Sequence, residues 1–125
     1  MKNTVTAILR IILGLIFLVF GLNGFAHFFQ PPAPAPAGME FFGALIKAGY
    51  MIPLVFGAQV AGGILLLLGF VALGVVILAP VVVNIVCFHF FLDPNGIAMA
   101  IAVAVMELVL VWNCREAFAP LLRRT

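Results

Sequence analysis

One continuous apolar run, from Met51 to Leu92, sets the strongest limit on what this chain can fold into. The run contains no Asp, Glu, Lys or Arg. As a single helix its roughly 40 residues would be about 60 Å long, which is twice the thickness of about 30 Å that a bilayer's hydrocarbon core has. The run must therefore turn back on itself. Gly69 and Gly74 bracket its midpoint, so we predict a tight turn at Gly69–Ala72.

The composition of the whole chain agrees with a fold embedded in a membrane. Of its 125 residues, 66% are hydrophobic and 8% are charged, whereas about a quarter of the residues are charged in soluble domains. The sequence predicts one all-α domain, residues 1–125, that is a transmembrane four-helix bundle. Its spans are predicted near residues 5–29, 53–69, 72–92 and 96–118. The first apolar stretch is too long for a signal-peptide h-region, so we interpret it as an uncleaved span.

A proline-rich segment separates the first two spans. The proline density of Gln30–Gly38 excludes helix and favours an extended chain. Between Met39 and Gly49, apolar residues recur at helical spacing on one side, and they are Phe41, Phe42, Leu45 and Ile46. This pattern predicts a short helix in the membrane interface, which Gly49 ends.

The basic residues predict the orientation of the bundle. Four spans put both termini on one side of the membrane. Basic residues gather near the termini, at Lys2, Arg10, Arg115, Arg123 and Arg124, whereas the opposite side has Lys47. The positive-inside rule therefore predicts cytoplasmic termini. The net charge of +2, without a basic cluster interleaved with aromatic residues, does not indicate a nucleic-acid partner.

Polar side chains inside the spans mark candidate sites, because they are costly to bury in a bilayer. Glu107 and Asn84 are predicted near mid-membrane, and a neutral cluster in the outer half consists of Asn23, His27, Gln59 and His89. A lone carboxylate at mid-membrane takes up a proton rather than stays charged. Glu107 is then either hydrogen-bonded to Asn84 or reached by Arg10, or it forms a proton-relay or cation site. We expect Arg10 to snorkel to the cytoplasmic surface.

The two histidines raise the question of haem. His27 and His89 are predicted at similar depth on different spans, which is the minimum for ligation by two imidazoles. Two histidines alone are weak evidence, so ordinary interhelical hydrogen bonding ranks first, a quinone head group second and haem last. Cys87 and Cys114 lack metal-ligand spacing, and no metal site is predicted. The chain has no serine, which excludes a serine nucleophile.

Small residues follow one stripe of the first span. Gly14, Gly21 and Gly24 recur at helical spacing, and Gly62 serves the second span in the same way. Small residues let two helices approach closely in a membrane. We interpret these glycines as a packing seam rather than a ligand site.

Several segments of the chain resemble the DoxX family of small four-span bacterial membrane proteins. The resemblance covers nearly the whole chain and rests on Leu9-Arg10 and on residues 13–17, 21–24, 57–69 and 79–94. It implies a multi-pass protein of the bacterial cytoplasmic membrane that belongs to a quinone-linked redox system. The family often has Glu where this chain has Gln59, so one ionisable group of the family is absent here.

The sequence thus leaves three functions open. The first is an accessory membrane subunit of a redox system, not catalytic alone and near quinone, whose polar pocket in the outer half consists of Asn23, His27, Gln59 and His89. The second is a scaffold whose glycine-lined faces recruit partner helices. The third is a small proton-coupled transporter that works as an oligomer around Glu107. The expected partners are the lipid bilayer and either further copies of the chain or a membrane redox complex.

Overall fold

Four long helices and one shorter helix make up most of the chain. The computed structural model describes residues 2–124, and its helices are α1 (Lys2–Ala26), α2 (Pro36–Ala48), α3 (Met51–Leu68), α4 (Val71–Phe91) and α5 (Ile97–Asn113). Single 3-10 turns follow at Pro94–Gly96, Arg115–Ala117 and Ala119–Leu122. Residues 2–124 contain no strand, and four of their helical stretches are long and apolar enough to cross a membrane. The predicted all-α bundle of four membrane helices is confirmed.

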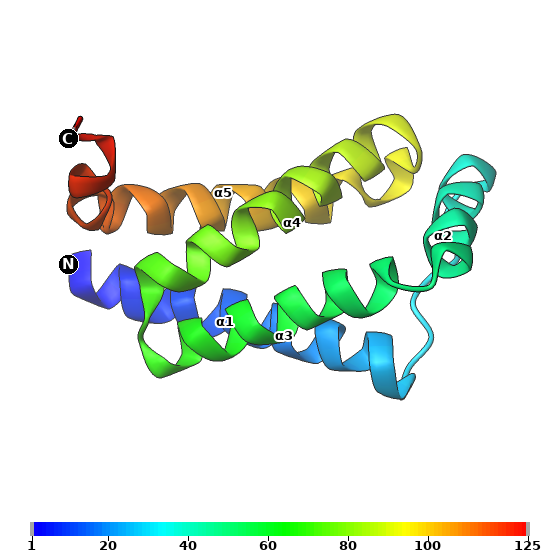
Figure 1. Cartoon of the computed structure of the whole chain (residues 1–125), viewed down its shortest axis with the longest axis horizontal. Coiled ribbons are helices and arrows are strands. Elements are labelled where there is room, and N and C mark those ends of the chain that lie inside the picture. The colour runs from blue at the N-terminus through cyan, green and yellow to red at the C-terminus, as the bar shows by residue number, and fades with distance from the viewer. Residues whose placement is uncertain (1, 125) are drawn as a thin grey trace.

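The long helices form a bundle in the spatial order α1, α3, α4, α5 (Figure 1). The most extensive packing is between α1 and α3, and α4 lies between α3 and α5. Asn113 Nδ2 donates a hydrogen bond of 3.1 Å to Thr6 Oγ1 and so joins α5 to α1. Both ends of the chain lie at one end of the bundle, and α2 lies across the other (Figure 1). Fully buried side chains fill the centre, among them Leu13, Phe17, Leu66, Leu78 and Leu110.

The turn between α3 and α4 falls where the length argument places it. Gly69 has a φ of 97°, a left-handed conformation that glycine adopts without strain. The Phe70 N–H donates to the Leu65 carbonyl at 2.8 Å, and the Gly69 N–H donates to the Leu66 carbonyl at 3.1 Å. This pair of bonds is the Schellman motif. The predicted turn is confirmed, and α4 begins directly after it, at Val71.

Arg10 binds the end of α3, a contact that the prediction of snorkelling to the cytoplasmic surface did not include. Its Nη1 donates to the carbonyl oxygens of Leu66 and Leu67, each at 2.9 Å. The last carbonyls of a helix have no intrahelical donor, and the end of α3 lies beside the first turns of α1. The guanidinium therefore finds acceptors within the bundle.

The first span ends at Ala26, three residues before the predicted end of 29. The cause is Asn23, whose side chain forms hydrogen bonds with both the N–H and the carbonyl group of Phe29. Asn23 Nδ2 donates to the Phe29 carbonyl at 3.0 Å, and the Phe29 N–H donates to Asn23 Oδ1 at 2.9 Å. His27 then takes a left-handed φ of 54°, a conformation that stops a helix.

The fourth span also ends early, at Asn113 rather than at 118. Arg115 folds back over the last turn of α5, where its Nη1 donates to the Trp112 carbonyl at 2.8 Å and its guanidinium lies 4.3 Å from the centre of the Trp112 ring. A cation at a helix C-terminus binds carbonyls that lack donors. The chain continues in 3-10 turns up to Leu122, where Pro120 has no N–H for a helical bond.

The helix between the first two spans begins at Pro36, inside the segment predicted to be extended. Proline fits the first turn of a helix because the N–H it lacks would be free there anyway. Gly49 ends α2 with a φ of 87°, as predicted. Phe41 and Phe42 both contact the Phe88 ring of α4, and their ring centres lie 5.8 and 5.7 Å from its centre. Two residues of the apolar side of α2 thus pack on α4, whereas Ile46 of the same side is exposed.

Candidate functional site

Glu107 is a buried carboxyl group in the middle of α5. The residue is 4% exposed, and neither carboxyl oxygen has a hydrogen-bond partner within residues 2–124. Buried polar groups in proteins are nearly always hydrogen-bonded, and an exception needs an explanation. An unsatisfied carboxyl group in an apolar interior lowers stability. Glu107 is therefore a candidate for function rather than for packing.

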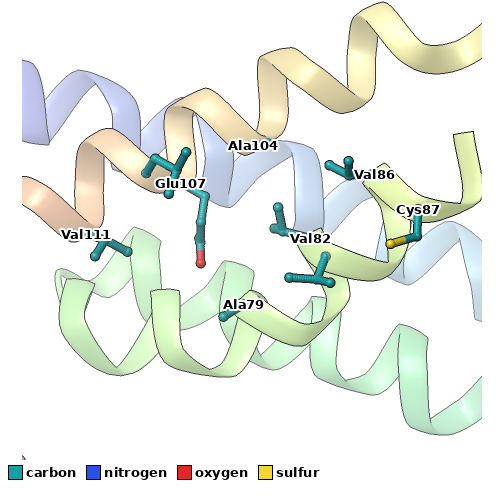
Figure 2. Close-up of a pocket in the computed structure, with 9 residues that line it drawn as sticks. Ala79, Val82, Val86, Cys87, Ala104, Glu107 and Val111 are labelled. Carbon is teal, nitrogen blue, oxygen red and sulfur yellow. The ribbon is translucent and has the colours of Figure 1, made fainter. Parts of the chain in front are cut away.

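A cavity of about 330 Å³ lies between α4 and α5 beside this carboxyl group. Figure 2 shows the Glu107 side chain extending from α5 into the space between the two helices. The lining side chains come from one face of each helix: Ala79, Val82, Val83, Val86 and Cys87 of α4, and Ala104, Glu107, Leu108 and Val111 of α5. Apart from the carboxyl group and the Cys87 thiol, this lining is entirely aliphatic.

The spacing of the lining residues explains the cavity. On α5, positions 104, 107, 108 and 111 fall on one face of a helix. Ala79 and Ala104 carry only a methyl group each, so the two helices leave space between them. Val83 and Leu108 are 62% and 66% exposed. The cavity therefore opens at the outer surface of α4 and α5, which faces hydrocarbon when the bundle spans a membrane.

The groups proposed from sequence as partners of Glu107 lie elsewhere. Asn84 is exposed on the outer surface of α4 and does not line the cavity. Arg10 is bound to the end of α3. The two interpretations that gave Glu107 an internal partner are therefore wrong, because α4 and α1 present these side chains in other directions.

The four residues predicted as an outer polar cluster are not brought together in one pocket. Asn23 is used at the end of α1, and His27 is exposed just beyond it. Gln59 is 7% exposed in α3, where its Cβ lies against Gly21 of α1, and it has no hydrogen-bond partner among the described residues. His89 Nδ1 lies 3.1 Å from the Asp93 carbonyl oxygen, in the turn between α4 and α5.

The surroundings of the two histidines bear on the haem hypothesis, in which both imidazoles would bind one iron. His89 packs its ring against Gly96, whereas His27 is on the outer surface at the end of α1. Within residues 2–124, no group of three or more His, Cys, Asp or Glu side chains is placed to hold a metal ion.

Asp93 is a buried acidic residue in the turn between α4 and α5, and it is not among the site residues predicted from the sequence. It is 8% exposed, and its Oδ1 accepts a hydrogen bond of 3.2 Å from the Ala35 N–H at the start of α2. Its Oδ2 lies 3.6 Å from His89 Nδ1. The spacing of four residues between His89 and Asp93 is the signal that could have indicated this contact. The hydrogen bond from Ala35 to Asp93 thus joins the end of the proline-rich segment to the bundle.

The glycines of the predicted seam lie inside the bundle. A Cβ on Gly14 would come within 3.0 Å of the Gly63 carbonyl oxygen, and a Cβ on Gly21 within 2.9 Å of the Val60 side chain. Gly24 lies against the Phe56 ring, and Gly62 against Leu78 of α4. All four glycines therefore let helices of the same chain approach each other.

The comparisons with known proteins give one significant relative. The chain is 30% identical over 131 aligned positions to the uncharacterized protein YwoB of Bacillus subtilis (strain 168), and the alignment covers 98% of this chain and 85% of YwoB. No family model matches the chain, and no solved structure matches it significantly. The likeness extends over all four membrane helices.

Proposed function

The chain belongs to the same family as YwoB of Bacillus subtilis, and we propose that it binds the head group of a membrane quinone at Glu107. In this role it is an accessory subunit of a membrane redox system. The observation that carries the proposal is the buried, unpartnered carboxyl group beside an apolar cavity. In this proposal the protein is not catalytic alone. Around Glu107, the Cys87 thiol is the one further lining group that could act as an acid, a base or a nucleophile.

The residues of the cavity fit a quinone. Such a molecule has a ring with polar oxygen atoms and a long apolar tail. Glu107 is able to donate a hydrogen bond to a ring carbonyl or to accept one from a ring hydroxyl. The aliphatic lining suits the ring faces, and the opening beside Val83 and Leu108 leads toward the bilayer, where the tail lies. A volume of about 330 Å³ is in the range of small-molecule sites.

The surroundings of Glu107 favour its neutral form as the binding group. The lining residues include no cation, and the Arg10 guanidinium is held by the α3 carbonyls. A carboxylate without a counter-charge is strongly disfavoured in an apolar interior. When bound, a quinone would supply reversible oxidation and reduction. This chain would hold its ring and exclude water from it.

The resemblance to the DoxX family supports the redox system as the setting, together with a location in the bacterial cytoplasmic membrane. The basic residues at the end with the termini, among them Arg115, Arg123 and Arg124, support cytoplasmic termini. The glycine-lined scaffold has less support, because Gly14, Gly21 and Gly24 already pack against α3.

Quenching of the single tryptophan tests the proposal. Trp112 lies five residues after Glu107 on α5, about 7.5 Å farther along the helix axis, and quinones quench indole fluorescence. The purified protein in nanodiscs is titrated with a ubiquinone or menaquinone of short tail. We expect a saturable quench in the native protein and in Glu107→Gln, which retains a donor and an acceptor. In Glu107→Leu only a linear, collisional quench should remain.

Glu116→Gln is the matched control, since Glu116 is an exposed carboxylate outside the membrane helices. Its titration should match that of the native protein. A linear quench in the native protein, or a saturable one in Glu107→Leu, would contradict the proposal. Saturable binding of a lipophilic cation that Glu107→Gln abolishes would instead favour the proton-coupled transporter.

A further inference from the structure

The outer face of α4 carries a regular seam that no part of the described chain covers. Its members alternate in steps of four and three residues: Leu73, Ile77, Pro80, Asn84, Cys87 and Phe91. Ile77 is half-buried and the other five are exposed, Phe91 by 72%. Residues spaced alternately by four and three occupy the a and d positions of a heptad repeat. Two helices pack along their length through these positions.

Asn84 is the polar member of this α4 seam. It lies near the middle of the span, on the outer surface, and its side chain has no hydrogen-bond partner among the described residues. A second polar group lies close by, because Pro80 has no N–H to donate to the Val76 carbonyl. Unsatisfied polar groups that face hydrocarbon are strongly disfavoured.

We propose that two copies of this chain associate through α4, in parallel, with the two Asn84 side chains hydrogen-bonded to each other. Copies inserted with the same orientation place Asn84 at the same depth without further adjustment. An amide is self-complementary, since it offers both donors and an acceptor. A two-fold axis along the membrane normal brings identical residues together. In the seam Asn84 holds an a position, where asparagine pairs in parallel two-stranded coiled coils.

The other outer faces of the bundle do not offer this combination. The exposed side chains along the middle of α1 are Ile8, Ile11, Ile12, Leu15 and Val19, and those of α5 are Met99, Ile101, Val105 and Leu108. Aliphatic side chains such as these are satisfied by lipid tails. Only α4, among the described spans, combines a heptad seam with an exposed amide near mid-membrane.

Cys87 gives a direct test, because it is exposed at the d position that follows Asn84. In a parallel dimer, the two Cys87 side chains face each other across the seam, within the range that a disulfide bridges. With Cys114 replaced by Ala, membranes are oxidised with copper phenanthroline. We expect a cross-linked band at twice the mass of the 13.4 kDa chain, and none after Cys87→Ala. Cross-linking to a different polypeptide instead would overturn the proposal.

Two adjacent phenylalanines provide a matched control for the geometry. Phe90 and Phe91 are 65% and 72% exposed, but only Phe91 is on the seam. In a cysteine-free background, Phe91→Cys should cross-link several times faster than Phe90→Cys. Equal rates, or a faster rate at position 90, would show that collisions rather than this interface bring the chains together.

The role of Asn84 is tested on the dimerisation constant, measured by energy transfer between labelled copies in vesicles. Asn84→Leu should weaken dimerisation about tenfold, and Asn84→Gln should retain most of it. Because Asn84 makes no hydrogen bond to another described residue and is exposed, the fold should survive both changes, and the thermal unfolding of the monomer checks this. An unchanged constant in Asn84→Leu would overturn the proposal. Glu107→Leu should dimerise normally, so this inference stands or fails separately from quinone binding.

Discussion

Gly14 of α1 and Gly63 of α3 meet backbone to backbone where the two helices cross. A Cβ on Gly63 would lie 2.8 Å from the carbonyl oxygen of Gly14 and 2.8 Å from the backbone nitrogen of Leu18. Both neighbours are backbone atoms, so neither is able to move away unless the whole helix shifts. Close approach of this kind is the main source of packing attraction between helices in a membrane, where no hydrophobic force pulls them together.

This crossing predicts that Gly63→Ala lowers the free energy of unfolding by about 1–3 kcal/mol, the usual range for overpacking. Thermal or forced unfolding in bicelles measures the change. Gly57→Ala is the matched control on the same helix, because a Cβ at Gly57 would meet nothing within 4 Å. The control should be neutral or gain up to about 1 kcal/mol, because alanine is the better helix former. A Gly63→Ala protein as stable as Gly57→Ala would mean that the crossing does not determine the result.

The bonds from Arg10 to the end of α3 predict a second loss of stability. Arg10→Met keeps an unbranched apolar side chain but removes the donor for the Leu66 and Leu67 carbonyls. We expect a loss of about 1.5–3 kcal/mol, the range for a hydrogen bond to a charged group. Arg10→Lys should recover part of it, since an ammonium group also donates. Arg123→Met, which changes an exposed arginine near the C-terminus, should have no effect.

Asn23 predicts a local rather than a global change. Asn23→Ala removes both hydrogen bonds to Phe29 and should lower the local stability of the turn at residues 27–29 by about 1–2 kcal/mol. Hydrogen exchange of the Phe29 amide should speed up by at least tenfold, while amides in the middle of α1 change little. Asn23→Asp keeps the acceptor for the Phe29 N–H and should protect that amide better than Ala does. Uniform exchange along α1 in Asn23→Ala would contradict the local role.

The helices and their turns were predictable because length and apolarity decide them. The run from Met51 to Leu92 is too long to cross a membrane once, and its central Gly69 supplies the left-handed turn. The ends at Ala26 and Asn113 were not predictable in the same way. They depend on where the Asn23 and Arg115 side chains reach, and the order of residues along the chain does not show that.

The candidate site was predictable in its residue but not in its surroundings. Glu107 stands out in sequence because a carboxyl group near mid-membrane is rare. Its supposed neighbour Asn84 sits at a similar depth, yet depth does not determine which way a helix faces. All of α4 is apolar apart from Asn84 and His89, so the sequence carries no amphipathic signal that would show its buried side. Only the packing of α4 on α3 and α5 determines that Asn84 faces outward.

The unsatisfied carboxyl group of Glu107 leads to a prediction in which stability and binding change in opposite directions. Glu107→Met replaces a buried carboxyl group by an apolar side chain of similar length. Because neither oxygen has a partner within residues 2–124, the change removes a buried polar group without breaking a hydrogen bond. We expect the free energy of unfolding to rise by about 1–3 kcal/mol.

The same variant should lose the saturable quenching of Trp112 by quinone. Unfolding in detergent and the quinone titration are measured on one preparation, so a misfolded sample is recognised by its lower stability. Leu108→Met is the matched control, since it changes a neighbouring lining residue and leaves the carboxyl group in place; it should alter neither quantity by much. A destabilised Glu107→Met protein would mean that the carboxyl group serves the fold, and a stabilised one that binds quinone normally would remove Glu107 from the site. Higher stability with lost binding is the result expected of a group retained for function, because a side chain that served only the fold would not be left unsatisfied.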